Sequence, residues 1–152
     1  MYKISKKYYL GIDPGTSKLG LAVVNDNKEI IYKSIVRINT VLDILQWIIE
    51  EYDIEDVIVG NGSNHRRIVG MINVIRIARN NQKKRLNIHI VDERNSSLEA
   101  RKIFVDKEKR FLKKMFCYIR SLFMDLDDYS AFVLVCRFIS NSGYIKRQIQ
   151  NL

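Results

Sequence analysis

The stretch "YYLGIDPGTSKLGLAVV", Tyr8 to Val24, contains two apolar runs separated by an acid and a turn. Asp13 ends the first run, and Pro14-Gly15 follows it directly. Proline and glycine favour tight turns, so the pattern predicts a β-hairpin. A carboxylate at the tip of a buried strand is unfavourable unless a cation or hydrogen-bond donors compensate for its desolvation. The candidate partners are a metal ion, a basic side chain and the backbone amides of the turn.

The hairpin is expected to form the first part of a three-stranded antiparallel meander. Strands are predicted over residues 8–13, 19–25 and 29–37. Thr40, with Asp43 three residues later, resembles a capping box that opens a helix. The apolar face of that helix is predicted to carry Val41, Leu42, Leu45, Ile48 and Ile49.

Strands and helices alternate in the second half of the chain. The apolar "DVIVG" of residues 56–60 is typical of a central parallel strand that is covered on both faces. A helix over 63–78, a strand over 86–91, a helix opened by the capping box at Ser96–Glu99 and a final helix over 126–139 are predicted to follow. The expected buried residues are Ile68, Met71, Ile72 and Ile75 in the first of these helices, and Phe132, Val133, Val135 and Cys136 in the last.

Two segments are less regular. Residues 104–124 fit a two-piece helix and an ordered basic loop equally well, and the end of the chain after Ser140 is expected to fray. With 152 residues, of which 47% are apolar, the chain is long enough for one domain with its own core. The sequence therefore predicts a single α/β domain over residues 1–152.

Positive charge is concentrated in one block of the sequence. The formal net charge is +9, and the segment from His65 to Arg120 holds 16 Lys/Arg against 5 Asp/Glu. Such a block suits a polyanionic partner, because each phosphate that is neutralised releases counterions. A solvated basic surface without a partner is the alternative.

Several classes of protein are excluded by composition. The sequence has no apolar run of about 18 residues that could span a membrane, and the apolar stretch after Lys7 meets Asp13 too soon for a signal peptide. We therefore expect a cytoplasmic protein. Cys117 and Cys136 are not spaced as a metal or redox motif and are expected to be free thiols, and two distant histidines exclude a structural zinc site.

Acidic residues stand at the ends of three predicted elements. Asp13 ends the first strand, Asp92-Glu93 ends the fifth, and Asp127-Asp128 starts the final helix. Because the ends of central strands meet along one edge of an open α/β sheet, these carboxylates are expected to converge. Converging carboxylates repel each other unless a cation lies between them, and Mg²⁺ or Mn²⁺ is the natural complement.

Each acid also has a purely structural interpretation. Asp13 can cap its turn through backbone amides, and Asp127 or Asp128 can stabilise the positive end of a helix. Glu93 can form a surface ion pair with Arg94. Their common placement at element ends favours a shared site.

Three stretches, "LGIDPGTSKLGLAVV", "VDERNSSLEAR" and "DDYSAFVLVCRFI", together resemble the YqgF (RuvX) branch of the RuvC-like nucleases, in the RNase H-like superfamily. The resemblance covers most of residues 10–139. It implies a five-stranded mixed sheet in the order 3-2-1-4-5 with helices on both faces. It also implies metal-dependent cleavage of nucleic acid, either in processing of the precursor of 16S ribosomal RNA or in resolution of Holliday junctions.

The resemblance assigns roles to individual residues. Its metal-binding acids fall on Asp13, Glu93 and Asp127, with Asp128 as the alternative to Asp127 because the doublet allows either register. Lys18 and Arg94 occupy basic positions of the first two motifs. Mg²⁺ or Mn²⁺ is the implied cofactor, with two such ions at the site. The chain departs from the RuvC resolvases at Asn61 and Asn64, where those enzymes place an acid, and it lacks the family's proline-rich connector before the last helix.

Two other functions are compatible with parts of the sequence. "GIDPGTS" also resembles the phosphate loop of the actin and sugar-kinase superfamily, but that fold needs two such domains around ATP. A non-catalytic nucleic-acid-binding module of the same fold is the remaining alternative, in which basic residues such as Arg66 and Arg67 grip phosphates. The sequence leaves open RNA against branched DNA, and a monomer against a weak homodimer.

Overall fold

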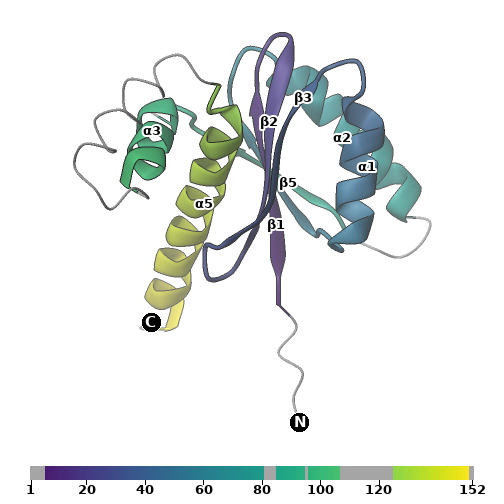
Figure 1. Ribbon diagram of the computed structural model, residues 1–152. Coiled ribbons are helices and arrows are strands. Elements are labelled where there is room, and N and C mark those ends of the chain that lie inside the picture. The colour runs from purple at the N-terminus through teal and green to yellow at the C-terminus, as the bar shows by residue number, and fades with distance from the viewer. Residues whose placement is uncertain (1–5, 81–84, 95, 107–124, 151–152) are drawn as a thin grey trace.

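The computed structural model describes residues 6–80, 85–94, 96–106 and 125–150. Five strands form one sheet in the order β3-β2-β1-β4-β5, as predicted (Figure 1). The β1–β2 and β2–β3 pairs are antiparallel, and the β1–β4 and β4–β5 pairs are parallel. The strands are β1 (Tyr8–Pro14), β2 (Lys18–Asn25), β3 (Ile30–Arg37), β4 (Asp56–Gly60) and β5 (Asn87–Val91).

Helices cover both faces of the sheet, which confirms the predicted architecture (Figure 1). Helices α1 (Val41–Glu51) and α2 (His65–Asn80) lie on one face, and α3 (Ser96–Asp106) and α5 (Asp127–Gln150) lie on the other. The expectation of a frayed end after Ser140 is wrong, because α5 continues to Gln150. The segment after Ser140 contains no proline, and its one glycine, Gly143, weakens a helix without breaking it. Residues 107–124, most of the connector with two open interpretations, lie outside the described residues.

Alternation along the strands builds a separate apolar core on each face. Leu10 and Ile12 of β1 belong to the core under α1 and α2, where Ile68, Ile72 and Ile75 of α2 are buried as predicted. The opposite core joins Ile58 of β4 and Ala22 and Val24 of β2 to Ala131, Leu134 and Val135 of α5. Phe132 and Cys136, expected to point inward, are only half-buried.

The start of α1 differs from the prediction. Thr40 makes no side-chain cap, and its hydroxyl instead donates to the carbonyl of Arg37 at 3.3 Å. Its φ and ψ of −111° and 3° depart from the extended backbone of a capping residue. Leu42, expected on the buried face, is 38% exposed. Helix α1 is thus held by its apolar contacts and not by the predicted capping box.

Helix α5 lies unusually close to the sheet. A Cβ atom on Gly11 would overlap the backbone of Ala131, and one on Gly20 would overlap the backbone at Asp127 and Asp128. Only glycine allows this approach, since any larger residue would push the helix away. The first turn of α5 therefore sits on β1 and β2 at the end of the sheet where β1, β4 and β5 finish, which we term the carboxyl edge.

No helix within the described parts of the chain is both long and apolar enough to cross a bilayer. Cys136 is a free thiol, and burial raises its pKa to about 11. A thiol with this pKa stays protonated and unreactive near neutral pH.

Candidate active site

Asp13 lies at the carboxyl edge on the face of the sheet that α5 covers. It follows Ile12 in β1 and pairs with Gly20 of β2 in the antiparallel ladder. The pKa of Asp13 is raised to about 7, first by burial and then by the charges of Asp127 and Glu93. The nearby Ser130 hydroxyl acts in the opposite direction, although it has no hydrogen-bond partner of good geometry among the described residues. Asp13 is thus a half-buried carboxyl group whose pKa is raised by the charges of Asp127 and Glu93.

Asp127 reaches the same place from α5. Its backbone carbonyl lies directly over Gly20, the residue opposite Asp13. Burial raises the pKa of Asp127, and the Lys18 ammonium partly offsets this rise. The close approach of helix to sheet therefore brings together two acids that are distant in the sequence.

Glu93 completes the group from the segment after β5. A Cβ on Gly62 would lie 2.6 Å from both carboxylate oxygens of Glu93, and one on Gly60 would lie 2.8 Å from Oε2. The carboxylate therefore rests on the glycine-lined end of β4. Burial raises the pKa of Glu93, opposed by the Gly62 backbone amide, and Oε2 is buried without a hydrogen-bond partner in the described chain.

Two asparagines after β4 connect the turns that carry these acids. The side-chain Oδ1 of Asn61 accepts a hydrogen bond from the backbone amide of Glu93 (3.1 Å). The backbone amide of Asn61 donates to the Val91 carbonyl (3.0 Å). Asn64 Nδ2 donates to the carbonyl of Gly15, two residues after Asp13, at 3.1 Å. Sequence reasoning noted these asparagines only as missing acids. In the structure they connect the loop after β4 to the backbone of Glu93 and to the turn after Asp13.

Asp128 points to a different partner. Its Oδ2 accepts from Lys33 Nζ of β3 at 2.6 Å, and Lys33 also lies over the Tyr129 ring, 4.4 Å from its centroid. Asp128 itself is 7% exposed. The structure therefore groups Asp127 with Asp13 and engages Asp128 in a separate ion pair.

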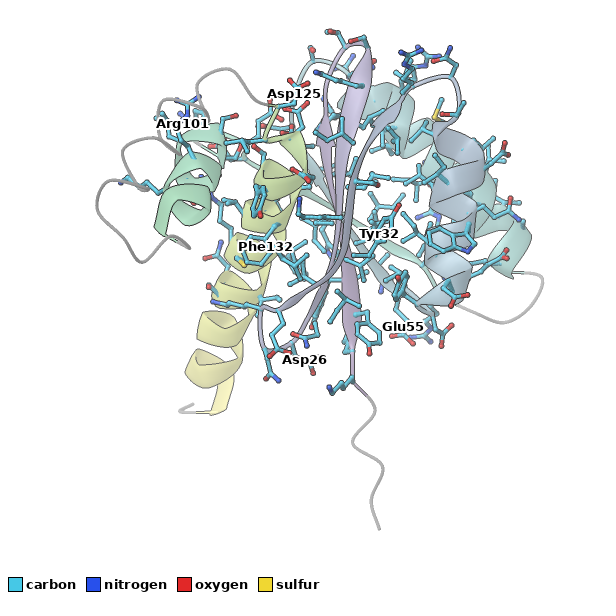
Figure 2. All side chains as sticks on the ribbon, in the orientation of Figure 1. Asp26, Tyr32, Glu55, Arg101, Asp125 and Phe132 are labelled. Atoms are coloured by element: carbon cyan, nitrogen blue, oxygen red, sulfur yellow. The ribbon has the colours of Figure 1, made fainter. Side chains whose placement is uncertain are left out.

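The predicted basic residues have varied surroundings. Lys18 pairs with Asp125, which is labelled in Figure 2 just before α5. Arg94 pairs with Asp92 at 2.7 Å and lowers the pKa of Asp92. The alternative interpretation of Glu93, as the surface ion-pair partner of Arg94, is therefore wrong. The reason is local: the Arg94 side chain is 87% exposed and turns back to the residue two before it, while Glu93 turns inward.

Arg66 and Arg67 stand in the first turn of α2. Both side chains are exposed. Helix α2 begins directly after Asn64, whose side chain contacts the turn after Asp13. Arg66 and Arg67 are therefore close in sequence to the loop that supports Asp13 and Glu93. The structure therefore leaves them accessible to a partner in solvent.

The carboxylates of Asp13, Glu93 and Asp127, termed the acid group, fit a hard divalent cation. Three carboxylates with raised pKa values and a buried, unpartnered Glu93 oxygen are oxygen ligands of the kind that Mg²⁺ and Mn²⁺ take. In the described chain, no three His, Cys, Asp or Glu side chains are grouped closely enough to hold one ion together. The three acids thus share the carboxyl edge without forming a single coordination sphere in this conformation.

A family model described as "RuvX: Holliday junction resolvase" matches residues 7–140. The chain belongs to the RuvX family. The match spans Asp13, Glu93 and Asp127, and it confirms the resemblance that the three sequence motifs indicated.

Solved structures with a similar fold include RuvC proteins. The RuvX-family chain superposes on the Thermus thermophilus RuvC structure with a TM-score of 0.51 and 12% identity, covering 84% of this chain and 89% of that one. It superposes on T. thermophilus RuvC in complex with a Holliday junction substrate with a TM-score of 0.56 and 15% identity, covering 93% and 96%. At these identities the likeness shows a shared fold. A search of curated proteins finds no match.

Proposed function

We propose that this RuvX-family chain is a metal-dependent nuclease that hydrolyses phosphodiester bonds in structured nucleic acid. The observation that carries the proposal is the convergence of Asp13, Glu93 and Asp127 at the carboxyl edge, where their charges or burial raise all three pKa values. Perturbed carboxyl groups gathered from separate elements are typical of functional sites. The family membership supports the same activity.

Asp13, Glu93 and Asp127 are the residues that would hold two Mg²⁺ or Mn²⁺ ions. Such ions, when bound, supply Lewis acidity that lowers the pKa of water and offsets charge on the phosphodiester. Asn61 and Asn64 fix the backbones of Glu93 and of the turn after Asp13, so the acids are held before substrate arrives. Hydrolysis by in-line attack of water would leave a 5′-phosphate and a 3′-hydroxyl, with no covalent enzyme intermediate.

Four basic residues are proposed to contact the substrate backbone. Lys18 lies close enough to Asp127 to lower its pKa, and the exposed guanidinium of Arg94 follows Glu93 directly. Arg66 and Arg67 extend the positive surface along the start of α2. Contacts of this kind position a nucleic acid without reading its sequence.

The precursor of 16S ribosomal RNA is the substrate that the sequence motifs imply, with cleavage in the cytoplasm. Holliday-junction DNA is the second candidate, favoured by the family description and by the RuvC complex with a junction. The two candidates differ in assembly. Resolving a four-way junction favours a two-fold dimer with paired sites, whereas trimming one RNA strand needs only a monomer.

The proposal is tested by cleavage of single-stranded RNA and of a synthetic four-way junction, side by side, with Mn²⁺ and with EDTA. We expect Mn²⁺-dependent cleavage of one substrate by the wild-type protein and none by Asp13→Asn. Binding of both substrates without cleavage of either would support the non-catalytic module instead. Cleavage that persists in EDTA would contradict the metal dependence.

A further inference from the structure

Arg137 of α5 grips the chain on both sides of Glu93. Its Nη1 donates to the carbonyl of Asp92 at 2.6 Å, and its Nη2 donates to the carbonyl of Arg94 at 2.8 Å. These are the two residues that flank Glu93 in the sequence. One side chain therefore holds the backbone before and after a proposed metal ligand.

The guanidinium of Arg137 is itself held by a third element. Nη2 also contacts Glu99 Oε1 of α3 at 2.6 Å, and the Arg137 side chain is only 24% exposed. A charged pair that also satisfies backbone acceptors is stronger than an ordinary surface ion pair. Arg137 thus joins α5, α3 and the segment after β5 at one point.

The segment that carries Glu93 lies beyond the last strand pairing of the sheet. β5 is an edge strand of the sheet and ends at Val91, so the Asp92 carbonyl lies beyond the ladder with β4. On the opposite side of the segment, Asn61 accepts the Glu93 amide. Arg137 and Asn61 therefore hold the backbone of Glu93 from two directions.

We propose that Arg137 is a positioning residue that sets the place of Glu93 relative to Asp127. Both Arg137 and Asp127 belong to α5. The two hydrogen bonds from Arg137 therefore fix the position of Glu93 relative to the helix that carries Asp127. The planar guanidinium supplies two donors in fixed directions, and a lysine ammonium at the same position cannot span both carbonyls in the same way. The consequence for catalysis rests on the proposed nuclease function, whereas the hydrogen bonds from Arg137 to the two carbonyls do not depend on it.

Backbone hydrogen exchange tests the grip without any activity. In Arg137→Met, and to a similar degree in Arg137→Lys, the Glu93 amide and the Ser96 amide, which donates to the Glu93 carbonyl at 2.9 Å, should exchange at least tenfold faster, while amides of β1 and β4 keep their protection. Lys28→Met is the matched control, because it removes another basic contact to α5, from Lys28 Nζ to the Ser140 hydroxyl at 2.7 Å, far from Glu93. Unchanged exchange at Glu93 and Ser96 in both Arg137 variants would overturn the proposal.

Mn²⁺ affinity, measured by electron paramagnetic resonance, tests the consequence. Loss of a residue that orients a metal ligand typically weakens affinity or activity about 10- to 100-fold. We expect Arg137→Met to bind Mn²⁺ within that range more weakly, with a lower kcat, a nearly unchanged KM for nucleic acid and partial recovery at excess Mn²⁺. Glu99→Gln should give a smaller effect in the same direction, and Lys28→Met none.

The two proposals fail in different ways. If the wild-type protein binds no Mn²⁺, the nuclease proposal fails while hydrogen exchange still decides whether Arg137 holds the Glu93 segment. If the wild type binds Mn²⁺ and Arg137→Met binds it equally well at unchanged exchange, Arg137 is only a packing contact and the inference is overturned.

Discussion

The carbonyl of Asp127 lies directly over Gly20, the residue that pairs with Asp13 in the β1–β2 ladder. The two acids are therefore brought together by main-chain packing and not by the choice of side-chain rotamers. This relationship makes the acid group sensitive to any atom added between α5 and the sheet.

Gly20→Ala should disrupt the site through sterics alone. The added methyl would overlap the backbone at Asp127, so the first turn of α5 must move away from Asp13. Overpacking of this kind typically lowers the free energy of unfolding by about 1–3 kcal/mol. The melting temperature and the rate of Mn²⁺-dependent cleavage should both decrease.

Gly70→Ala is the matched control for that substitution. Gly70 is exposed in α2, and a Cβ there would meet nothing within 4 Å. Alanine should stabilise the helix by about 0.5–1 kcal/mol and leave cleavage unchanged. A Gly20→Ala protein as stable and active as Gly70→Ala would contradict the close packing of α5.

Replacing each acid of the Asp127-Asp128 doublet separates their roles. Asp127→Asn removes a proposed metal ligand and should abolish Mn²⁺-dependent cleavage while the protein stays folded. Asp128→Asn loses the ion pair with Lys33 and should lower stability by about 1 kcal/mol with cleavage retained. Kinetics and thermal unfolding of the two variants check this, and the reverse pattern of activity would assign the ligand to Asp128.

The stability of the metal-free protein should fall as the pH rises from about 4 to about 7. The pKa of Asp13 is raised to about 7 in the folded state, so the folded protein binds more protons than the unfolded chain in this window. Above about pH 7, where Asp13 has ionised in the folded state, the fold is therefore destabilised by on the order of 4 kcal/mol at most.

Asp13→Asn, which cannot ionise, tests that pH dependence. In EDTA it should be more stable than the wild type at pH 8, and the difference should vanish near pH 4. Chemical denaturation across this range measures both curves. Parallel curves for the two proteins would show that Asp13 has an ordinary pKa.

Arg66 and Arg67 are expected to act through phosphate contacts. The double substitution to alanine should weaken nucleic-acid binding and reduce the slope of log K against log [salt] by about 2, one contact for each arginine. Lys6→Ala, at the opposite end of β1, serves as the control and should leave the slope unchanged. Binding titrations over a range of salt concentrations measure the slope, and an unchanged slope in the double variant would place the substrate elsewhere.

The sheet was predictable from sequence because its signals are local. Alternation in residues 8–24 and the apolar "DVIVG" segment define strands whose neighbours follow from short turns and parallel crossovers. The family motifs then imply the strand order and point to Asp13, Glu93 and one acid of the Asp127-Asp128 doublet. The capping box at Thr40 failed because a matching residue spacing does not fix the backbone φ and ψ that a cap needs.

The contacts that hold the site together were not predictable in the same way. Gly20 matters only because α5 crosses it, and Asn61 and Arg137 act on backbone groups of Glu93 from other elements. Contacts of this kind join residues that are far apart in the sequence, so no residue spacing predicts them. The ion pair between Asp128 and Lys33, which separates the surroundings of Asp127 and Asp128, likewise involves a residue of a different strand.

Titration of the protein with Mn²⁺, followed by calorimetry, tests the central claim most directly. Wild type, Asp13→Asn, Glu93→Gln and Asp127→Asn would be compared at pH 8, with Asp128→Asn as the folded control. We predict binding by the wild type and by Asp128→Asn, and loss of binding in each of the other three variants. Equal Mn²⁺ binding by all five proteins would contradict a site built from Asp13, Glu93 and Asp127.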